Sequence, residues 1–347
     1  MTPLRFAIIG AGNIGKIQAE AIAHIPDTEV TVVCNRGEEA GRALARHCQA
    51  GWVADFAQAV VRDDVDIVTI CTPSGTHTEI AVAAAQAGKH LLVEKPIDIT
   101  LPRVDAIINA AEQAGIVLAC VFPTRFADGP HKAKEALDAG RLGVLSFADC
   151  YVKWFRDQAY YDGNWRGTWA LDGGGALMNQ SIHSIDLLQW LAGPIKRVTA
   201  KTKTLAHEME TEDTAAAILE FENGALGVIQ GATSCWPGDR QSVQLRGDKG
   251  TIELAEGRIV TWQLADAAEG EEEAMLNLEQ AKGSGAADPT AIGFEMHRRQ
   301  IVDVIEAIRD DRSPRILGAE ARKSVELIRA IYHSSQTGYS VELPLQE

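Results

Sequence analysis

Short apolar runs alternate with longer helical patterns over the first third of the chain. Runs of strand length, most of them bounded by Gly, Pro, Asp or Asn, lie at 6–9, 30–33, 67–70, 91–93 and 117–121. Amphipathic patterns of helical period lie between them, at 14–23, 38–48, 56–61, 78–87 and 102–114. This alternation is typical of βαβ units and predicts a parallel sheet with helices on both faces.

The pattern changes near Phe122. Longer strand-like segments follow at 143–155, 195–203, 214–220, 225–232 and 242–246, with turn sequences between them and one helical pattern at 176–191. We therefore predict an α/β protein of two domains. Residues 1–121 form the doubly wound domain, and residues 122–347 form an α+β domain built on a large, open, mostly antiparallel sheet.

The last quarter of the chain begins with an acidic stretch rich in Ala and Gly at 264–289. A surface excursion is the prediction, with a disordered segment as the alternative. Two helices at 294–309 and 319–335 and a short strand at 340–343 follow. The closing helices are assigned to the second domain, with packing against the first domain as the alternative.

Composition narrows the classes of function. The formal net charge is −15 and the pI is near 5.1, whereas proteins that bind nucleic acid or anionic membranes need a basic surface. No apolar run is long enough for a signal peptide or a membrane span, so we expect a cytoplasmic protein. The six scattered cysteines are expected to be reduced, and the nine histidines lack metal-ligand spacing, so no metal is expected.

A glycine motif, Gly10-Ala11-Gly12-Asn13-Ile14-Gly15, follows the first apolar run and opens the first helix. In this context GxGxxG indicates a dinucleotide-binding turn, with an ordinary βα turn as the alternative. Gly10 permits the tight turn, Gly12 lets a pyrophosphate approach the backbone, and Gly15 lets the helix pack closely on the strand. Asn13 and Ile14 begin the helix whose free N–H groups attract the anion.

Asn35 and Arg36 end the second predicted strand, about 20 residues after the last glycine, where an acidic residue commonly binds the ribose 2′-hydroxyl of NAD. Asn does not repel a 2′-phosphate, and Arg36 can pair with one. We therefore favour NADP, or use of both NAD and NADP. In the alternative, Asn35 binds a 2′-hydroxyl and Arg36 points into solvent.

Two further motifs are more specific. The first runs from Cys71-Thr72-Pro73 through His77 to Val93-Glu94-Lys95-Pro96, and the second from Gly173-Gly174-Gly175 through Asn179-Gln180 to His183 and Asp186. Together with the glycine motif, they resemble the glucose–fructose oxidoreductase / inositol dehydrogenase / MocA (Gfo/Idh/MocA) family over nearly the whole chain. The resemblance implies a Rossmann domain, a substrate-binding α+β domain and NAD(P)-dependent chemistry on a sugar or polyol.

The resemblance makes Lys95 the central catalytic residue, and the chemistry agrees. Removal of hydride from a secondary alcohol requires a base within hydrogen-bond reach of the hydroxyl. Lys95 follows a strand, at the carboxyl edge where open α/β sheets bind ligands. Burial and the positively charged oxidised nicotinamide both lower the pKa of a lysine. A solvated lysine at a strand end is the alternative.

Asn179 and His183 are four residues apart and are predicted to share one helix face. The resemblance implies that His183 is a second acid/base group or orients the hydroxyl, and that Asn179 holds substrate or Lys95. The polyol dehydrogenases of the family have Asp where Asn179 stands, and Asn cannot relay a proton. That work therefore falls to His183 and Lys95. A hydrogen-bonded core histidine is the alternative for His183.

The resemblance also implies contacts around this centre. Thr72, Pro73 and His77 are expected near the nicotinamide ribose. Lys95 is also expected to contact the cofactor, with its amine facing the nicotinamide, and Glu94 is expected to contact the cofactor or support Lys95. The segment 160–167 combines aromatic faces, amides and an arginine, which are the groups that bind a pyranose. Expected substrate-binding residues are Lys95, Arg125, Tyr160, Trp165, Arg166, Asn179 and His183, with a structural role as the alternative for Tyr160.

The leading hypothesis is an NAD(P)-dependent dehydrogenase of a sugar, polyol or glycoside that reacts at a secondary hydroxyl such as C3. One alternative is a lyase or glycosidase that uses tightly bound NAD(P) without net redox change. Another is a dinucleotide-binding regulator without enzyme activity. The open sheet face needs a cover, so a homodimer or homotetramer is expected.

Overall fold

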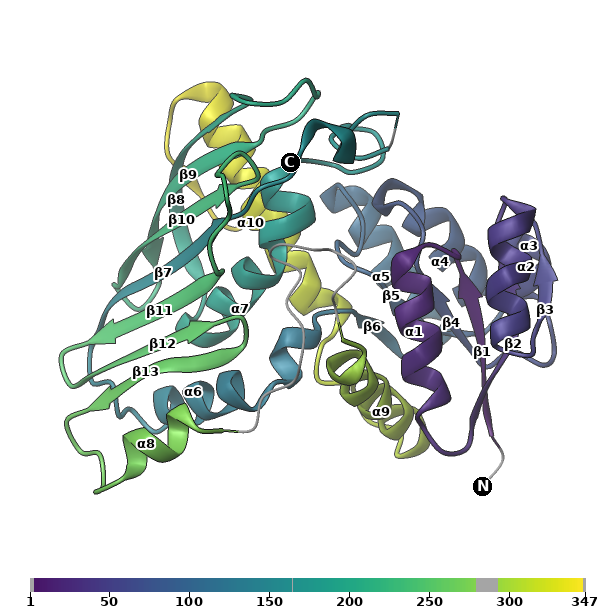
Figure 1. Ribbon diagram of the computed structural model, residues 1–347, viewed down its shortest axis with the longest axis horizontal. Helices are drawn as coiled ribbons and strands as arrows, with labels where there is room; N and C mark the ends of the chain where they lie inside the picture. The colour runs from purple at the N-terminus through teal and green to yellow at the C-terminus, as the bar shows by residue number, and fades with distance from the viewer. Residues whose placement is uncertain (1–2, 164, 279–292, 346–347) are drawn as a thin grey trace. The chain divides into compact units, whose positions relative to one another are not determined.

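The computed structural model describes residues 3–163, 165–278 and 293–345 (Figure 1). The chain forms two compact units. The first comprises residues 1–123 and 292–322, and the second comprises residues 124–291 and 323–347. None of the described helices is long and apolar enough to cross a membrane.

Six parallel strands form the sheet of the first unit, in the order β3-β2-β1-β4-β5-β6. They are β1 (Leu4–Ile9), β2 (Thr28–Cys34), β3 (Gly51–Val53), β4 (Ile67–Ile70), β5 (His90–Val93) and β6 (Leu118–Cys120). This is the strand order of a Rossmann fold, whose ligand site lies outside the carboxyl ends of the strands where the order reverses. The predicted parallel sheet is confirmed, and β3 is an addition to it.

The helices of the first unit are α1 (Asn13–Ala23), α2 (Glu38–His47), α3 (Phe56–Val60), α4 (His77–Gln86), α5 (Leu101–Ala114) and α9 (Glu295–Arg309). Helix α2 has Glu38 and Glu39 in its first turn and Arg46 and His47 in its last turn. Acidic groups at the start and basic groups at the end interact favourably with the helix dipole and stabilise the helix. The buried core includes Phe6, Ile8, Ile67 and Leu92 of the strands.

Helix α9 belongs to the first unit, although the sequence analysis assigned its residues to the second domain. Its buried side chains Ile301, Val304 and Ile305 join the same core cluster as Ile22 of α1. Burial of these apolar side chains against α1 therefore assigns α9 to the first unit. This packing against the first domain is the alternative given in the sequence analysis.

Eight strands form the sheet of the second unit, in the order β13-β12-β11-β7-β10-β9-β8-β14. They are β7 (Leu145–Lys153), β8 (Ile195–Lys203), β9 (Thr214–Phe221), β10 (Leu226–Ala232), β11 (Ser242–Gly247), β12 (Gly250–Ala255), β13 (Arg258–Leu264) and β14 (Val341–Glu342). All neighbours are antiparallel except β7 and β10, which are parallel. The predicted large, mostly antiparallel sheet is confirmed.

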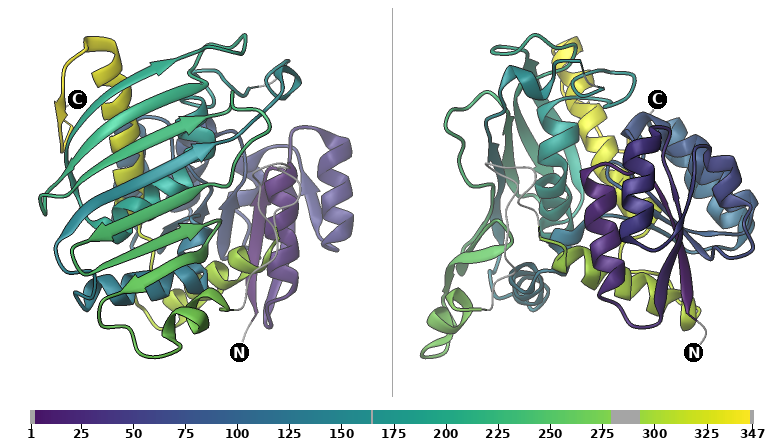
Figure 2. Two further views of the ribbon diagram at one scale, coloured as in Figure 1. Left: turned by 60° about the vertical axis from the view of Figure 1, so that its left-hand side comes forward. Right: turned by 45° about the vertical axis from the view of Figure 1, so that its right-hand side comes forward.

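Helices α6 (Asp128–Asp138) and α7 (Ile182–Ala192) and the C-terminal part of α10 (Gly318–Thr337) cover one face of this sheet (Figure 2). Ser334 of α10 accepts a hydrogen bond from the backbone of Ala200 in β8, which ties helix and sheet together. Among the described residues, the opposite face of β7, β9 and β10 has no helix over it. The predicted acidic excursion contains α8 (Glu271–Leu276), and its residues from 279 onward lie outside the described part.

Candidate active site

The glycine motif forms the turn between β1 and α1. Gly10 has φ of 109°, a conformation that favours glycine, and a Cβ there would lie 2.5 Å from the carbonyl oxygen of Cys71. A Cβ at Gly15 would collide with the carbonyl oxygen of Gly10. Packing of the protein itself therefore requires these two glycines.

Gly12 differs from its two neighbours in the motif. It is the N-cap of α1 with an ordinary φ of −74°, and a Cβ there would meet nothing within 4 Å. The fold leaves this space open beside the N-terminus of a helix, where N–H groups and the helix dipole attract an anion. The turn therefore fits the pyrophosphate of a dinucleotide, which is the group that needs close approach at this position.

Asn35 ties the end of β2 to the glycine turn. Its Oδ1 accepts the N–H of Ala11 at 3.0 Å, and its Nδ2 donates to the carbonyl of Gly37 at 2.8 Å. Arg36 is exposed beside it. The amide thus holds the loop on which a bound ribose would rest, and the neighbouring guanidinium is accessible to a ligand.

His77 connects the ends of β4 and β5. One ring nitrogen, Nε2, lies 3.0 Å from the carbonyl oxygen of Thr72, and the other, Nδ1, lies 3.0 Å from that of Pro96. The side chain is 1% exposed, and burial lowers its pKa. His77 therefore braces the two loops that carry Thr72, Pro73 and Lys95.

Lys95 is half-buried and follows β5 directly, at the same sheet edge as the glycine turn after β1 and Thr72 after β4. The preceding Glu94 is buried and accepts a hydrogen bond of 2.7 Å from Nε2 of Gln18 in α1. Burial raises the pKa of Glu94 to about 7, against the opposing effect of Gln18. The lysine therefore follows a buried carboxyl group whose pKa lies near neutral pH.

Asn179 and His183 lie in the second unit, on either side of a change in helix type. Asn179 is in a π-helical turn, Ala176–Ser181, and His183 is in the first turn of α7. Both side chains are half-buried. π-Helical turns inside helices occur frequently at functional sites. The predicted single helix at 176–191 is therefore a π-turn that continues into an α-helix.

Two buried acidic residues, Asp172 and Glu212, fix the segment that runs from the glycines to Asn179. Oδ1 of Asp172 accepts a hydrogen bond of 2.6 Å from Nδ2 of Asn179. Glu212 accepts the backbone N–H groups of Gly175 at 3.0 Å and Leu177 at 2.8 Å. Burial raises the pKa of Glu212 to about 7. These acceptors fix the backbone and one side chain of the segment that carries Asn179.

The expected sugar-binding segment forms an aromatic and cationic cluster. The guanidinium of Arg166 lies 4.5 Å from the ring centroid of Tyr160 and 5.2 Å from that of Trp165. Arg156 approaches the same tyrosine ring at 5.6 Å. The hydroxyl of Tyr160 accepts a hydrogen bond of 3.3 Å from Nε2 of Gln180 in the π-turn. The segment and the π-turn therefore meet, while Asn164 lies outside the described residues.

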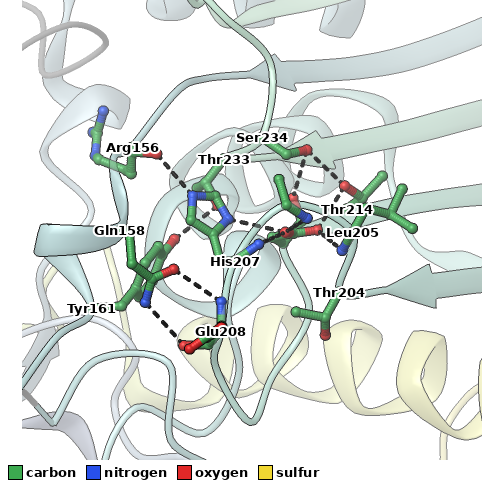
Figure 3. Close-up of polar contacts among 12 residues, drawn as sticks. Arg156, Gln158, Tyr161, Thr204, Leu205, His207, Glu208, Thr214, Thr233 and Ser234 are labelled. Atoms are coloured by element: carbon green, nitrogen blue, oxygen red, sulfur yellow. Dashed lines mark hydrogen bonds and ion pairs between the residues drawn. The ribbon is translucent and has the colours of Figure 1, made fainter.

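The loop between β8 and β9 supports the expected sugar-binding segment and the residues just before it (Figure 3). Nδ1 of His207 lies 3.0 Å from Oδ2 of Asp213, and its Nε2 lies 2.8 Å from the carbonyl oxygen of Arg156. Gln158 and Glu208 exchange two hydrogen bonds. Through the backbone of residues 210 and 211, the loop also donates two hydrogen bonds to the carbonyl of Gly167.

Arg125 has a buried ionic partner. Its Nε and Nη2 each donate to a carboxylate oxygen of Asp186 at 2.7 Å, and the two side chains are 6% and 1% exposed. Such a bidentate pair fixes the planar guanidinium. The geometry gives Arg125 a structural role beside its expected contact with substrate.

Several residues of this site have no signal in the sequence pattern. Gln18, His207 and Glu212 act through contacts with segments that are distant in the chain. Asp172 and Asp213 bond to residues seven and six positions away, and both lie in loops that carry no periodic pattern. Tyr332, whose hydroxyl donates a hydrogen bond to Glu212, likewise has no signal in the sequence pattern. Among the residues that the structure describes, no cluster of His, Cys, Asp or Glu is arranged to hold a metal ion.

Comparison with known proteins assigns the class. The sequence profile described as "Oxidoreductase family, NAD-binding Rossmann fold" matches residues 4–122, and the "GFO/IDH/MocA C-terminal domain" matches residues 131–253. The chain therefore belongs to the Gfo/Idh/MocA family of oxidoreductases, as its motifs predicted.

Particular relatives cover most of the chain. It is similar to the WlbA dehydrogenase from Bordetella pertussis, solved with NADH and UDP-GlcNAcA, with 32% identity, a TM-score of 0.88, and coverage of 99% of this chain and 100% of that chain. It is 29% identical to myo-inositol 2-dehydrogenase of Thermotoga maritima over 76% of this chain and 78% of the relative. It is 27% identical to levoglucosan dehydrogenase of Pseudarthrobacter phenanthrenivorans over 80% of this chain and 68% of the relative.

Proposed function

We propose that this protein is an NAD(P)-dependent dehydrogenase that oxidises a secondary hydroxyl, such as that at C3, of a sugar or glycoside. A nucleotide-linked sugar acid is the first candidate, since WlbA binds UDP-GlcNAcA and is similar over its whole length. The observation that carries the proposal is the position of Lys95. It stands at the same sheet edge as the open space at Gly12 and is half-buried.

A nicotinamide held at this edge of the sheet would supply the hydride acceptor. Lys95 takes the proton of the substrate hydroxyl, and the carbon becomes a ketone as its hydrogen leaves with two electrons. His183 and Asn179 orient the hydroxyl, and Trp165 and Arg166 hold the sugar ring. The turn from Gly10 to Gly15, with Asn13 and Ile14 at the start of α1, binds the pyrophosphate through backbone N–H groups.

The test is reduction of NAD or NADP, followed by absorbance, with a panel of nucleotide sugars, sugar acids, free hexoses and inositols. Lys95→Ala is expected to abolish turnover of the best substrate while cofactor binding persists. Retention of near-full activity in that variant would refute the mechanism. Bond cleavage without net reduction of cofactor would instead indicate redox-neutral chemistry.

A preference for NADP remains a proposal, supported by the neutral Asn35 and the exposed Arg36. WlbA, which was solved with NADH, makes NAD the competing outcome. Arg36→Ala is expected to raise the KM for NADP and leave that for NAD unchanged, because only NADP carries the 2′-phosphate. A lower KM for NAD than for NADP in the wild type would refute the preference. A cytoplasmic location is proposed as well, and cell fractionation tests it.

A homo-oligomer formed through the open face of the second sheet is also part of the proposal. Phe147, Leu226 and Ile218 on β7, β10 and β9 are 49%, 47% and 60% exposed. Leu226 is paired with Phe147, and Ile218 with the half-buried Val228, so all four side chains share the open face. An apolar patch of this kind is typical of a surface that another subunit covers.

A further inference from the structure

Asn179, to which the proposed function assigns a role, has a defined partner within the second unit. Its Nδ2 donates to Oδ1 of Asp172 at 2.6 Å, and Asp172 is 1% exposed. The other carboxylate oxygen, Oδ2, accepts the backbone N–H of Gly167 at 2.9 Å. The buried carboxylate therefore links Asn179 to the segment that carries Trp165 and Arg166.

The charge of Asp172 decides which end of the Asn179 amide faces it. A carboxylate accepts hydrogen bonds and cannot donate them, so only the NH2 end of Asn179 can bond to it. The two ends of an amide have nearly the same shape, and sterics alone would permit either orientation. The carbonyl oxygen Oδ1 of Asn179 is thereby turned away from Asp172.

We propose that Asp172 is a positioning residue for the reaction. It locks the Asn179 amide so that Oδ1 serves as the hydrogen-bond acceptor for the substrate hydroxyl. In this chain the acceptor is neutral and does not titrate, and the carboxylate lies one hydrogen bond farther from the reaction. The inference rests on the proposed function for the identity of the donor.

An isosteric change at Asp172 tests the lock directly. In Asp172→Asn, one acceptor oxygen replaces two, while the N–H of Gly167 and the NH2 of Asn179 both still require an acceptor. If the oxygen serves Gly167, the introduced NH2 group faces Asn179 and forces its amide to rotate. We expect kcat to fall about 100-fold, as for a misplaced catalytic group, with little change in the KM for NAD(P).

The reverse change should fail for a different reason. Asn179→Asp places two carboxyl groups at the 2.6 Å contact, and like charges at that distance cannot both be ionised. The pair then shares a proton, so its activity is expected to decline as pH rises and that proton is lost. The wild type, with a single carboxylate in the pair, lacks this step in its pH profile.

The double variant D172N/N179D restores both hydrogen bonds. The bond between positions 172 and 179 then has its donor and acceptor exchanged, while the N–H of Gly167 still donates to position 172. The introduced amide offers its oxygen to Gly167 and its NH2 to the introduced carboxylate, whose second oxygen takes the place of Oδ1 of Asn179. We expect kcat to recover to within about tenfold of the wild type, since the interaction is pairwise and the two sites are coupled. A pair needed only for folding would be rescued as well, so kcat is measured well below the thermal midpoint of each variant, where a fall in kcat reports positioning and not unfolding.

The experiment combines kcat, KM and pH profiles of the wild type and three variants with their thermal midpoints. Wild-type kcat in D172N, or a double variant no more active than the weaker single variant, would overturn the inference. The thermal midpoints require no substrate and therefore separate this inference from the proposed function. If no sugar is oxidised by the wild type, a double variant more stable than additivity predicts still supports the lock, and additive midpoints overturn it.

Discussion

Tyr332 and Glu212 are hydrogen-bonded inside the second unit: the tyrosine hydroxyl donates to Oε1 at 3.0 Å, and the two side chains are 4% and 3% exposed. The same carboxylate accepts the N–H groups of Gly175 and Leu177. A Cβ at Gly174 would collide with the Tyr332 hydroxyl, and one at Gly175 with the carbonyl of Glu212. The pair therefore explains why glycine is required at positions 174 and 175, and it anchors the π-turn that carries Asn179.

Replacement of Glu212 with Gln is expected to destabilise the protein by about 1–3 kcal/mol and to lower kcat. The introduced amide has one acceptor oxygen, so the N–H of Gly175 or of Leu177 loses its partner in a buried environment. Urea unfolding and steady-state kinetics measure the two effects. Tyr332→Phe is the matched control, because it removes one donor and keeps both backbone bonds, at a cost of about 1 kcal/mol. Equal losses in the two variants would contradict this assignment.

The first unit could be predicted from the sequence because each of its signals is local. Apolar runs of strand length alternate with helical patterns, and the glycine motif lies at the turn between two of them. The place of α9 could not be predicted, because its apolar stripe fits any core, and only the folded chain shows that it is buried in the core of the first unit beside α1. Strands β12 and β13 were missed because short turns separate them, and half of their residues are polar or partly exposed.

The candidate site was predictable where residue type and position limit the chemistry, as at Lys95 and the glycine turn. The supporting residues were not predictable, since a lone acidic residue such as Asp172 or Glu212 usually lies on a solvated surface. Only the fold shows that these carboxylates are buried and bonded to the backbone beside Asn179. Likewise, no pattern distinguishes a π-turn from the first turn of an α-helix.

Gly12→Ala is expected to weaken cofactor binding without destabilising the protein. The added methyl group meets no protein atom within 4 Å and fits the backbone conformation, so it occupies only the space reserved for the pyrophosphate. The KM for NAD(P) should rise at least about tenfold, an increase that corresponds to about 1.4 kcal/mol of binding energy, while the thermal midpoint stays at its wild-type value. Gly15→Ala is the contrasting variant, because its methyl group collides with Gly10 and should lower the midpoint. Unchanged cofactor binding in Gly12→Ala would place the pyrophosphate elsewhere.

Glu94 should make stability depend on pH. Burial raises its pKa from 4.5 to about 7, so the folded state retains a proton that the unfolded state has lost within this interval. Its contribution is complete below about pH 4.5 and is lost as pH rises through about 7, up to roughly 3 kcal/mol. The protonated acid can also donate to Oε1 of Gln18, a buried acceptor without a hydrogen-bond partner among the described residues.

Glu94→Gln is the control that isolates this carboxyl group, because a glutamine keeps the bond from Gln18 and does not titrate. The free energy of unfolding, measured with urea at about pH 5 and about pH 8, should fall more steeply with pH in the wild type than in the variant. Other titrating groups, Glu212 among them, are present in both proteins and cancel in the difference. Identical pH slopes would show that Glu94 is ionised in the folded protein throughout this range.

Ile218→Asp is expected to dissociate the proposed oligomer. The side chain is 60% exposed on the open sheet face, beside Val228 and close to the paired Phe147 and Leu226. A carboxylate at this position would have to be buried without a partner when a second subunit covers the face, and that desolvation opposes association. Light scattering after size exclusion should give a multiple of 37.4 kDa for the wild type and a single chain mass for the variant. Val61→Asp is the matched control, a residue 67% exposed in the first unit, and should leave the assembly intact. A monomeric wild type, or an oligomeric Ile218→Asp variant, would show that this face does not form the interface.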